Sequence, residues 1–237
     1  MTETPRLSVV VPVHDEEDNL EPLHREICDA LKTMSEAFEL VLVDDGSRDR
    51  SLERMRALAA RDPRVRIVVL EGNHGQTAAL DAGFRAARGE ITATLDADLQ
   101  NDPHDLPKLL SCLDRADVVN GVRVDRHDSL VRKISSKIGN GFRNWMTGES
   151  VTDVGCSIRV MRTEYLRRVK LFRGMHRFLP TLLRMEGARL IEIPVAHRAR
   201  HSGRSKYGIA NRLFVGLADV LAVRWMQSRA IRYRVRE

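Results

Sequence analysis

The chain has 237 residues, of which 43% are hydrophobic and 30% are charged, and its formal net charge is +6. This composition excludes an intrinsically disordered chain, and the length argues for one domain with an extension rather than two full domains. Cys28, Cys112 and Cys156 lie far apart and form no C-x-x-C pair, so they support neither a disulfide framework nor a zinc ribbon.

The two ends of the chain carry no targeting or membrane-spanning pattern. The start, "MTETPRLSVVVPVHDEE", lacks a basic region followed by a small-residue cleavage site. The apolar run "LFVGLADVLAV" lies between Arg212 and Arg224 and is interrupted by Asp219, and it is shorter than the roughly 20 residues that a spanning helix needs. We therefore expect a cytoplasmic protein that does not cross a membrane by itself.

The first half of the chain alternates between β-branched runs and segments with helical periodicity. Strands are predicted at 7–13, 38–44, 65–70 and 91–96, and helices at about 20–34, through 52–58 and within 75–89. Continuous apolar strands separated by helices are typical of βαβ units, in which a parallel sheet is buried on both faces. The sequence therefore predicts an α/β fold with a mostly parallel sheet flanked by helices.

Polar residues follow each of these four predicted strands, in "PVHDEE", "VDDGSRD", "EGNHGQ" and "DADLQ". In open parallel sheets, ligands bind beyond the carboxyl ends of the strands. Any one of these segments is equally well explained as a turn or a helix cap, because Asp, Ser and Gly are favoured there. Four such ends in succession favour a binding site.

The fourth of these segments has the ligands of a hard cation. In an extended segment Asp96 and Asp98 point to the same side, and Gln100 continues that side if the segment stays extended. Two carboxylates and an amide oxygen suit Mg²⁺ or Mn²⁺ shared with the phosphates of a nucleotide. The chain has no G-x-G-x-x-G after its first strand, no P-loop motif and no G-x-S-x-G elbow. These absences argue against a dinucleotide-binding protein, a P-loop protein and a hydrolase of the elbow type.

The second half is more basic. "SLVRKISSKIGNGFRNWM" predicts a helix that packs on the core, lies at a membrane surface or binds a phosphate. Its apolar stripe comprises Leu130, Ile134, Ile138, Phe142 and Trp145, and its basic residues are Arg132, Lys133, Lys137 and Arg143. The basic segment "HRARHSGRSKYG", an apolar helix and an Arg-rich tail follow.

Seven segments together resemble the family 2 glycosyltransferases, in particular the dolichol-phosphate mannosyltransferase-like branch. They are "VVVPVHDEEDNL", "LVDDGSRDRS", "GNHGQTAALDAGFRAARGE", "LDADLQNDP", "GVRVDR", "VTDVGCSIRVMR" and "RHSGRSKYG", in the order of the family, from Leu7 to about Tyr207. The resemblance implies a GT-A fold and the inverting transfer of a sugar from a GDP- or UDP-linked hexose to a polyprenyl phosphate, with Mg²⁺ or Mn²⁺.

The resemblance also implies roles for individual residues. The base and ribose pocket would be lined by Pro12, His14, Glu16, Val43, Asp44 and Asp45. The metal and diphosphate segment would be Asp96, Ala97, Asp98 and Gln100, with Asp98 and Gln100 as the most direct metal ligands. Arg123 would face the donor, and Arg200, Ser205 and Lys206 would close over the phosphates.

The chemistry of a phosphate acceptor agrees with these roles. Negative charge builds on the departing diphosphate in the transition state, so a cation and basic side chains aimed at it lower the barrier. A phosphate monoester is already ionised near neutral pH and needs no general base. Arg123, Arg132 and Lys137 are candidates to bind this phosphate, and Asp153 of "VTDVGC" would orient the acceptor, orient a loop or cap a turn.

The chain departs from the family pattern at three positions, which carry His14 for Tyr, Asp15 for Asn and Asp102 for Pro. Because of His14, the sequence does not specify which nucleobase the donor carries.

We expect a catalytic domain over 1–207 and an extension over 208–237. Helix 209–228 and the tail would bind the inner membrane face peripherally, or the helix would pack on the core.

Three other functions are weighed against this one. The same fold could act on a saccharide or small-molecule acceptor, or could bind a nucleotide sugar as a catalytically silent partner of a membrane enzyme. The sequence pI near 9.6 would suit a nucleic-acid-binding protein. Scarce aromatic residues and dispersed charges argue against nucleic acid.

Overall fold

The computed structural model describes residues 4–34, 37–124, 130–198 and 209–231, with the backbone alone described over the helical residues 130–138 and 209–215. The chain divides into two compact units. Unit 1 comprises Met1–His127 and Asp153–Arg204, and unit 2 comprises Asp128–Thr152 and Ser205–Glu237.

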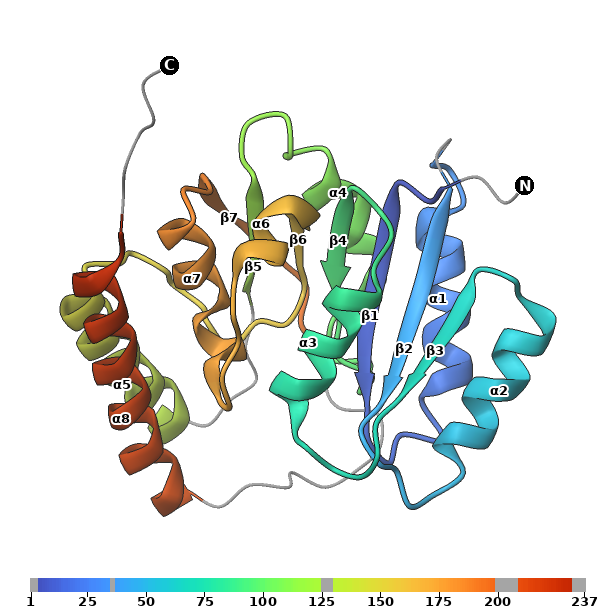
Figure 1. Cartoon of the computed structure of the whole chain (residues 1–237), viewed down its shortest axis with the longest axis horizontal. Helices are drawn as coiled ribbons and strands as arrows, with labels where there is room; N and C mark the ends of the chain where they lie inside the picture. The colour runs from blue at the N-terminus through green and yellow to red at the C-terminus, as the bar shows by residue number, and fades with distance from the viewer. Residues whose placement is uncertain (1–3, 35–36, 125–129, 199–208, 232–237) are drawn as a thin grey trace. The chain divides into compact units, whose positions relative to one another are not determined.

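Unit 1 is built on one seven-stranded sheet with the order β3-β2-β1-β4-β6-β5-β7 (Figure 1). Only β6 is antiparallel to its neighbours, so the prediction of a mostly parallel α/β sheet is confirmed. The strands are β1 Leu7–Val13, β2 Phe38–Asp44, β3 Val65–Val69, β4 Ile91–Thr94, β5 Val118–Arg123, β6 Arg159–Arg162 and β7 Leu190–Val195.

Helices cover both faces of this sheet. One apolar core contains side chains of α1, α2 and α4, and a second core contains side chains of α3, α6 and α7. Because side chains alternate along a strand, β1 sends Val9 and Val11 into the first core and Val10 into the second. The helices are α1 Leu20–Leu31, α2 Ser51–Arg61, α3 Gln76–Ala86, α4 Leu106–Leu110, α6 Thr163–Arg168 and α7 Leu179–Met185, with 3₁₀ turns η1 Pro103–Asp105 and η2 Met175–Phe178.

The strand order places a topological switch between β1 and β4. From β1 the chain proceeds outward to β2 and β3, and it then returns to add β4 on the other side of β1. These four strands are parallel, so their carboxyl ends lie at one edge of the sheet. A crevice at such a switch is where open α/β sheets bind their ligands.

Unit 2 consists of α5 (Leu130–Thr147) and α8 (Ile209–Arg229), which pack together, and Gln227 Nε2 donates to the Thr147 carbonyl at 2.9 Å. Both helices were predicted. The core-facing interpretation of the α5 stripe is wrong for its described side chains, because Phe142 is 40% and Trp145 is 76% exposed. Arg143 is buried instead, and its guanidinium donates to the carbonyl of Val151 at 2.7 Å.

The expected boundary near residue 207 stays a prediction, and the unit that contains α8 also contains α5. None of the described helices combines the length and the hydropathy that crossing a membrane requires.

Candidate active site

Hydrogen bonds join the loops that follow β1 and β2. The Asp15 amide donates to Ser47 Oγ at 3.1 Å, and the Glu16 amide donates to Ser51 Oγ at 2.8 Å. In return, Asp15 Oδ1 accepts the Arg48 amide at 2.7 Å. Asp15 has a φ of 53°, a left-handed conformation that non-glycine residues adopt rarely and Asp more readily than most. The two loops are therefore held together at the carboxyl ends of β1 and β2.

Asp44 and Asp45, at the end of β2, hold neighbouring loops. Asp44 Oδ1 accepts the Ser47 amide at 3.2 Å, and Asp45 accepts the amides of His74 at 2.7 Å and of Gly75 at 2.9 Å, just before α3. Gly46 lies so close to the β3–α3 loop that a Cβ would stand 2.4 Å from a Gly72 backbone atom. These contacts fix the loop after β3 against the loop after β2.

The predicted base and ribose residues lie on adjacent strands and loops. Pro12 pairs with Val43 in the register of β1 and β2. The His14 ring lies 3.0 Å from Asn73 Nδ2, and Glu16 Oε2 accepts from Asn19 Nδ2 at 2.6 Å. Their roles in nucleotide binding stay predictions.

The segment that carries Asp96 and Asp98 is a turn, so the assumption that it stays extended is wrong. β4 ends at Thr94, Leu99 has a φ of 59°, and the Asp98 Oδ1 accepts the Gln100 amide at 3.2 Å. Alternation along a strand therefore does not set the direction of Gln100. Its role as a metal ligand stays a prediction.

The two carboxylates of this turn repel one another. The pKa of Asp96 is raised to about 6, because burial and the negative charge of Asp98 outweigh a hydrogen bond from Ser157 and the positive charges of Arg159 and Arg123. Gln76 Nε2 also donates to Asp96 Oδ1 at 2.8 Å. A cation between the carboxylates would relieve the repulsion, and hard oxygen ligands suit Mg²⁺ or Mn²⁺. The residues present fit a divalent cation.

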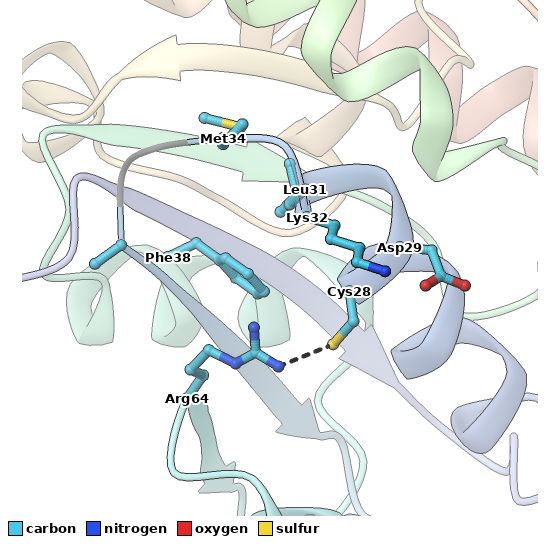
Figure 2. Close-up of a pocket in the computed structure, with 8 residues that line it drawn as sticks. Cys28, Asp29, Leu31, Lys32, Met34, Phe38 and Arg64 are labelled. Carbon is cyan, nitrogen blue, oxygen red and sulfur yellow. Dashed lines mark hydrogen bonds between the residues drawn. The ribbon is translucent and has the colours of Figure 1, made fainter.

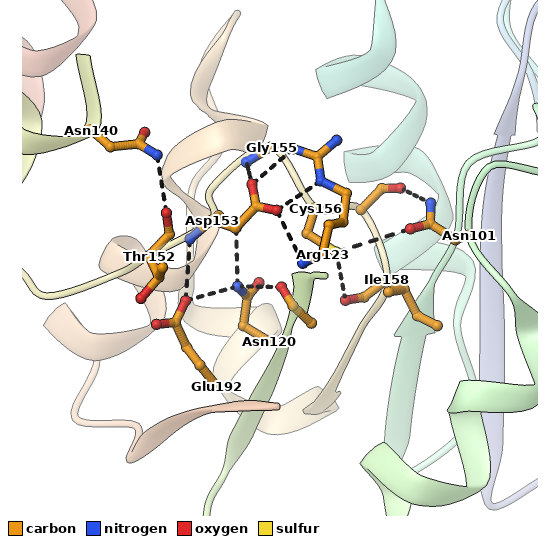
Figure 3. Close-up of polar contacts among 12 residues, drawn as sticks. Asn101, Asn120, Arg123, Asn140, Thr152, Asp153, Gly155, Cys156, Ile158 and Glu192 are labelled. Atoms are coloured by element: carbon orange, nitrogen blue, oxygen red, sulfur yellow. Dashed lines mark hydrogen bonds and ion pairs between the residues drawn. The ribbon is translucent and has the colours of Figure 1, made fainter. Parts of the chain in front are cut away.

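Arg123, whose charge acts on Asp96, forms a largely buried ion pair with Asp153 (Figure 3). The Arg123 Nε and Nη2 atoms donate to the two Asp153 oxygens at 2.7 and 2.8 Å. Asp153 is 5% exposed and also accepts the Gly155 amide at 3.1 Å. A Cβ at Gly155 would stand 2.7 Å from Arg123 Nη2, so a glycine leaves room for the guanidinium. Asp153 thus orients the Arg123 guanidinium, and its role toward the acceptor stays a prediction.

Sequence reasoning missed Arg159 and His176. Arg159 begins β6 and is 5% exposed, and its guanidinium donates to the carbonyls of Cys156 and His176. Because β6 is antiparallel, its first residue lies at the edge where β4 ends. The available signal was an arginine inside the apolar run "SIRVM".

His176 is held neutral by its surroundings. The Thr77 hydroxyl accepts the Gly174 amide at 3.1 Å, and it forms a hydrogen bond of 2.7 Å with His176 Nδ1. Burial, with the charges of Arg177 and Arg159, lowers the pKa of His176 to about 3.

We expect the free energy of unfolding to fall as the pH drops below about 6.5, because the unfolded chain then takes up a proton at His176 that the folded chain refuses. The loss is at most about 1.4 kcal/mol per pH unit. Urea unfolding at pH 7.5 and 5.5 should show a smaller loss in His176→Gln, whose amide has both a donor and an acceptor for Thr77. An unchanged pH dependence in this variant would contradict the account.

The remaining predicted residues lie outside the described part. Arg200, Ser205 and Lys206 are not among the described residues. Arg132 and Lys137 lie in the helical stretch of which only the backbone is described.

A cavity of about 460 Å³ lies near the amino end of β2, away from the carboxyl ends of the strands (Figure 2). Its wall contains Cys28, whose thiol approaches His24 Nε2 at 3.6 Å and Asp62 at 3.9 Å, the donor set of a soft cation. Arg64 already supplies the positive charge, because its Nη2 donates to Asp62 at 2.8 Å and to Cys28 at 3.3 Å. This group is an ion-paired cluster and carries no metal-site assignment.

An open, mostly parallel sheet with paired carboxylates at its topological switch defines a GT-A glycosyltransferase fold. Glucosyl-3-phosphoglycerate synthase from Mycobacterium tuberculosis, solved with Mn²⁺, UDP and phosphoglyceric acid, has this fold with a TM-score of 0.69. It is 18% identical, and the match covers 96% of this chain and 80% of that one.

The chain belongs to glycosyl transferase family 2, whose family profile matches residues 8–170. It is 41% identical over 236 residues to the dodecaprenyl-phosphate galacturonate synthase of Rhizobium johnstonii, covering 97% of this chain and 68% of that protein. It is 42% identical over 205 residues to the undecaprenyl-phosphate 4-deoxy-4-formamido-L-arabinose transferase of Edwardsiella ictaluri, covering 86% and 63%. The chain thus spans roughly two thirds of the length of these curated relatives.

Proposed function

We propose that this glycosyltransferase transfers a sugar, with inversion, from a UDP- or GDP-linked donor to a polyprenyl phosphate. The observation that carries the proposal is the Asp96–Asp98 turn at the switch of the sheet, in a chain whose relatives at about 40% identity are named for polyprenyl-phosphate acceptors. The acceptor phosphate is itself the nucleophile, so no side chain has to remove a proton from it.

In this proposal Asp96 and Asp98 hold Mg²⁺ or Mn²⁺ on the donor diphosphate, with Gln100 as a further ligand. The cation would neutralise charge that develops on the departing nucleoside diphosphate. Asp153 orients Arg123 toward that charge, and the ion pair keeps the guanidinium in place before the donor binds. Arg200 and Lys206, with Ser205, would add further positive and polar groups, and Arg132 and Lys137 would bind the acceptor phosphate.

The decisive experiment offers the purified protein a panel of UDP- and GDP-sugars with a short-chain polyprenyl phosphate and either Mg²⁺ or Mn²⁺. We expect one donor to yield a glycosylated lipid by mass spectrometry, dependent on the metal and absent in Asp98→Ala. Nucleotide binding without a lipid product from any donor would overturn the proposed acceptor or the proposed catalysis.

We further propose that unit 2 associates peripherally with the inner membrane face. Trp145 and Trp225 are 76% and 64% exposed, Leu221 is 51% exposed, and the exposed Arg224 adds positive charge on α8. Aromatic and aliphatic side chains beside basic ones suit the surface of an anionic bilayer. Replacing both Trp145 and Trp225 with serine should reduce co-sedimentation with anionic liposomes, whereas replacing the exposed Phe172 of unit 1 should not. Equal retention of both variants would contradict this.

A further inference from the structure

The end of β7 and the residues after it lie along the segment that follows the Asp96–Asp98 turn. Lys108 Nζ donates to the Pro194 carbonyl at 2.7 Å, and the Ala196 amide donates to Asp105 Oδ2 at 2.8 Å. His197 forms an antiparallel bridge with Asn101. Segment 194–198 is therefore joined to segment 100–108 by main-chain and side-chain contacts.

Arg198 ends this joined segment with two ion pairs. Its guanidinium contacts Glu26 of α1 at 2.7 Å and Asp102 at 2.5 Å. The three side chains are 38%, 28% and 21% exposed, respectively, so solvent screens these pairs in part. Ion pairs that solvent screens in this way contribute little to stability. The contribution of Arg198 to the fold is accordingly small.

A short chain of contacts leads from Arg198 to Asp98. The Arg198 amide donates to the Gln100 carbonyl at 2.8 Å, and the Gln100 amide donates to Asp98 Oδ1 at 3.2 Å. Leu99, which lies between Asp98 and Gln100, has a left-handed φ of 59°. Surrounding contacts must maintain this conformation. The peptide groups around Gln100 are thus held from one side by Arg198, and they orient the Asp98 carboxylate on the other.

We propose that Arg198 is a positioning residue for the metal ligand Asp98, with Asp102 and Glu26 fixing its side chain. The inference rests on the proposed metal-dependent function. Groups that orient a metal ligand through a hydrogen bond typically change metal affinity by about 10- to 100-fold when they are replaced. Removing the ion pairs should therefore weaken metal binding much more than it weakens the fold.

The test measures Mn²⁺ affinity of the full chain by electron paramagnetic resonance, with UDP and with GDP. Arg198→Gln should bind Mn²⁺ about 10-fold more weakly or worse. Asp102→Asn, which breaks the same contact from the other partner, should act in the same direction, and Arg198→Lys should retain part of the affinity. The matched control is Arg189→Gln, because Arg189 directly precedes β7 and pairs with Asp117 at 3.1 Å. Its Mn²⁺ affinity should equal that of the wild type.

The outcomes separate the two proposals. Unchanged Mn²⁺ affinity in Arg198→Gln, with a wild type that binds the ion, overturns the positioning role alone. A wild type that binds no Mn²⁺ with either nucleotide overturns the proposed metal-dependent function and this role together. A loss of thermal stability in Arg198→Gln as large as that of a buried-pair variant would show that the residue supports the fold instead.

Discussion

Replacing Asp98 with asparagine is expected to lower kcat/KM for sugar transfer by about 10³-fold, which corresponds to about 4 kcal/mol of transition-state stabilisation. The substitution removes a negative charge from the turn, where a cation would counter the charge of the departing diphosphate. Asparagine keeps an oxygen at the position that accepts the Gln100 amide, so the turn itself should persist. Transfer rates should be measured at saturating and at limiting Mn²⁺.

Two further observations make this expectation specific. The Asp98→Asn protein should unfold at nearly the wild-type temperature, and excess Mn²⁺ should recover part of the rate if weakened binding causes the loss. The control is Asp81→Asn, which removes an acidic charge from the surface of α3, where Asp81 pairs with Arg85 at 2.7 Å. Loss of activity by less than 10-fold in Asp98→Asn would remove this residue from the metal site.

Replacing Asp153 with alanine is expected to lower the free energy of unfolding by about 3 kcal/mol or more. The Arg123 guanidinium would lose its bidentate partner while it stays largely buried, and taking one member from a buried ion pair costs about 3–5 kcal/mol. The amides of Gly155 and Arg123 would lose an acceptor as well. Urea unfolding at neutral pH measures this difference directly.

The double variant Arg123→Met with Asp153→Leu distinguishes the cause. Removing both charges should restore much of the stability lost in Asp153→Ala, while transfer activity should stay low because the guanidinium is absent. Removing Asp117, whose Arg189 partner is 66% exposed, should cost less than Asp153→Ala. Asp117 and Asp153 are similarly buried, so equal losses at the two positions would contradict the importance of a buried arginine partner.

The fold was predictable because its strands are nearly continuous apolar runs. "LSVVVPV" and "FELVLVD" became β1 and β2, with alternate residues in two cores, as a sheet covered on both faces requires. Grouping of the four polar strand ends at one edge followed from the parallel order alone.

Contacts between distant segments were not predictable in the same way. Asp153 pairs with Arg123 across 30 positions of the chain, and the pattern of neither segment specifies its partner. The direction of Gln100 depends on a left-handed Leu99, although strand periodicity predicts an extended backbone there. Arg143 illustrates the same limit, since helical periodicity places basic residues outward and the Val151 carbonyl draws this one inward.

The carboxylate of Asp45 lies at the beginning of α3. It limits which positive groups of the protein can balance the charge of a bound phosphate. The N-terminal end of a helix carries a partial positive charge, and many nucleotide-binding folds use it to hold a phosphate. Here Asp45 already binds the two amides that precede α3, so the protein has satisfied that dipole internally with its own anion. Under the proposed function, the negative charge of the diphosphate must then be balanced by the cation and by basic side chains. Nucleotide affinity should then follow the concentration of free metal closely, which makes the metal a condition of donor binding as well as of transfer.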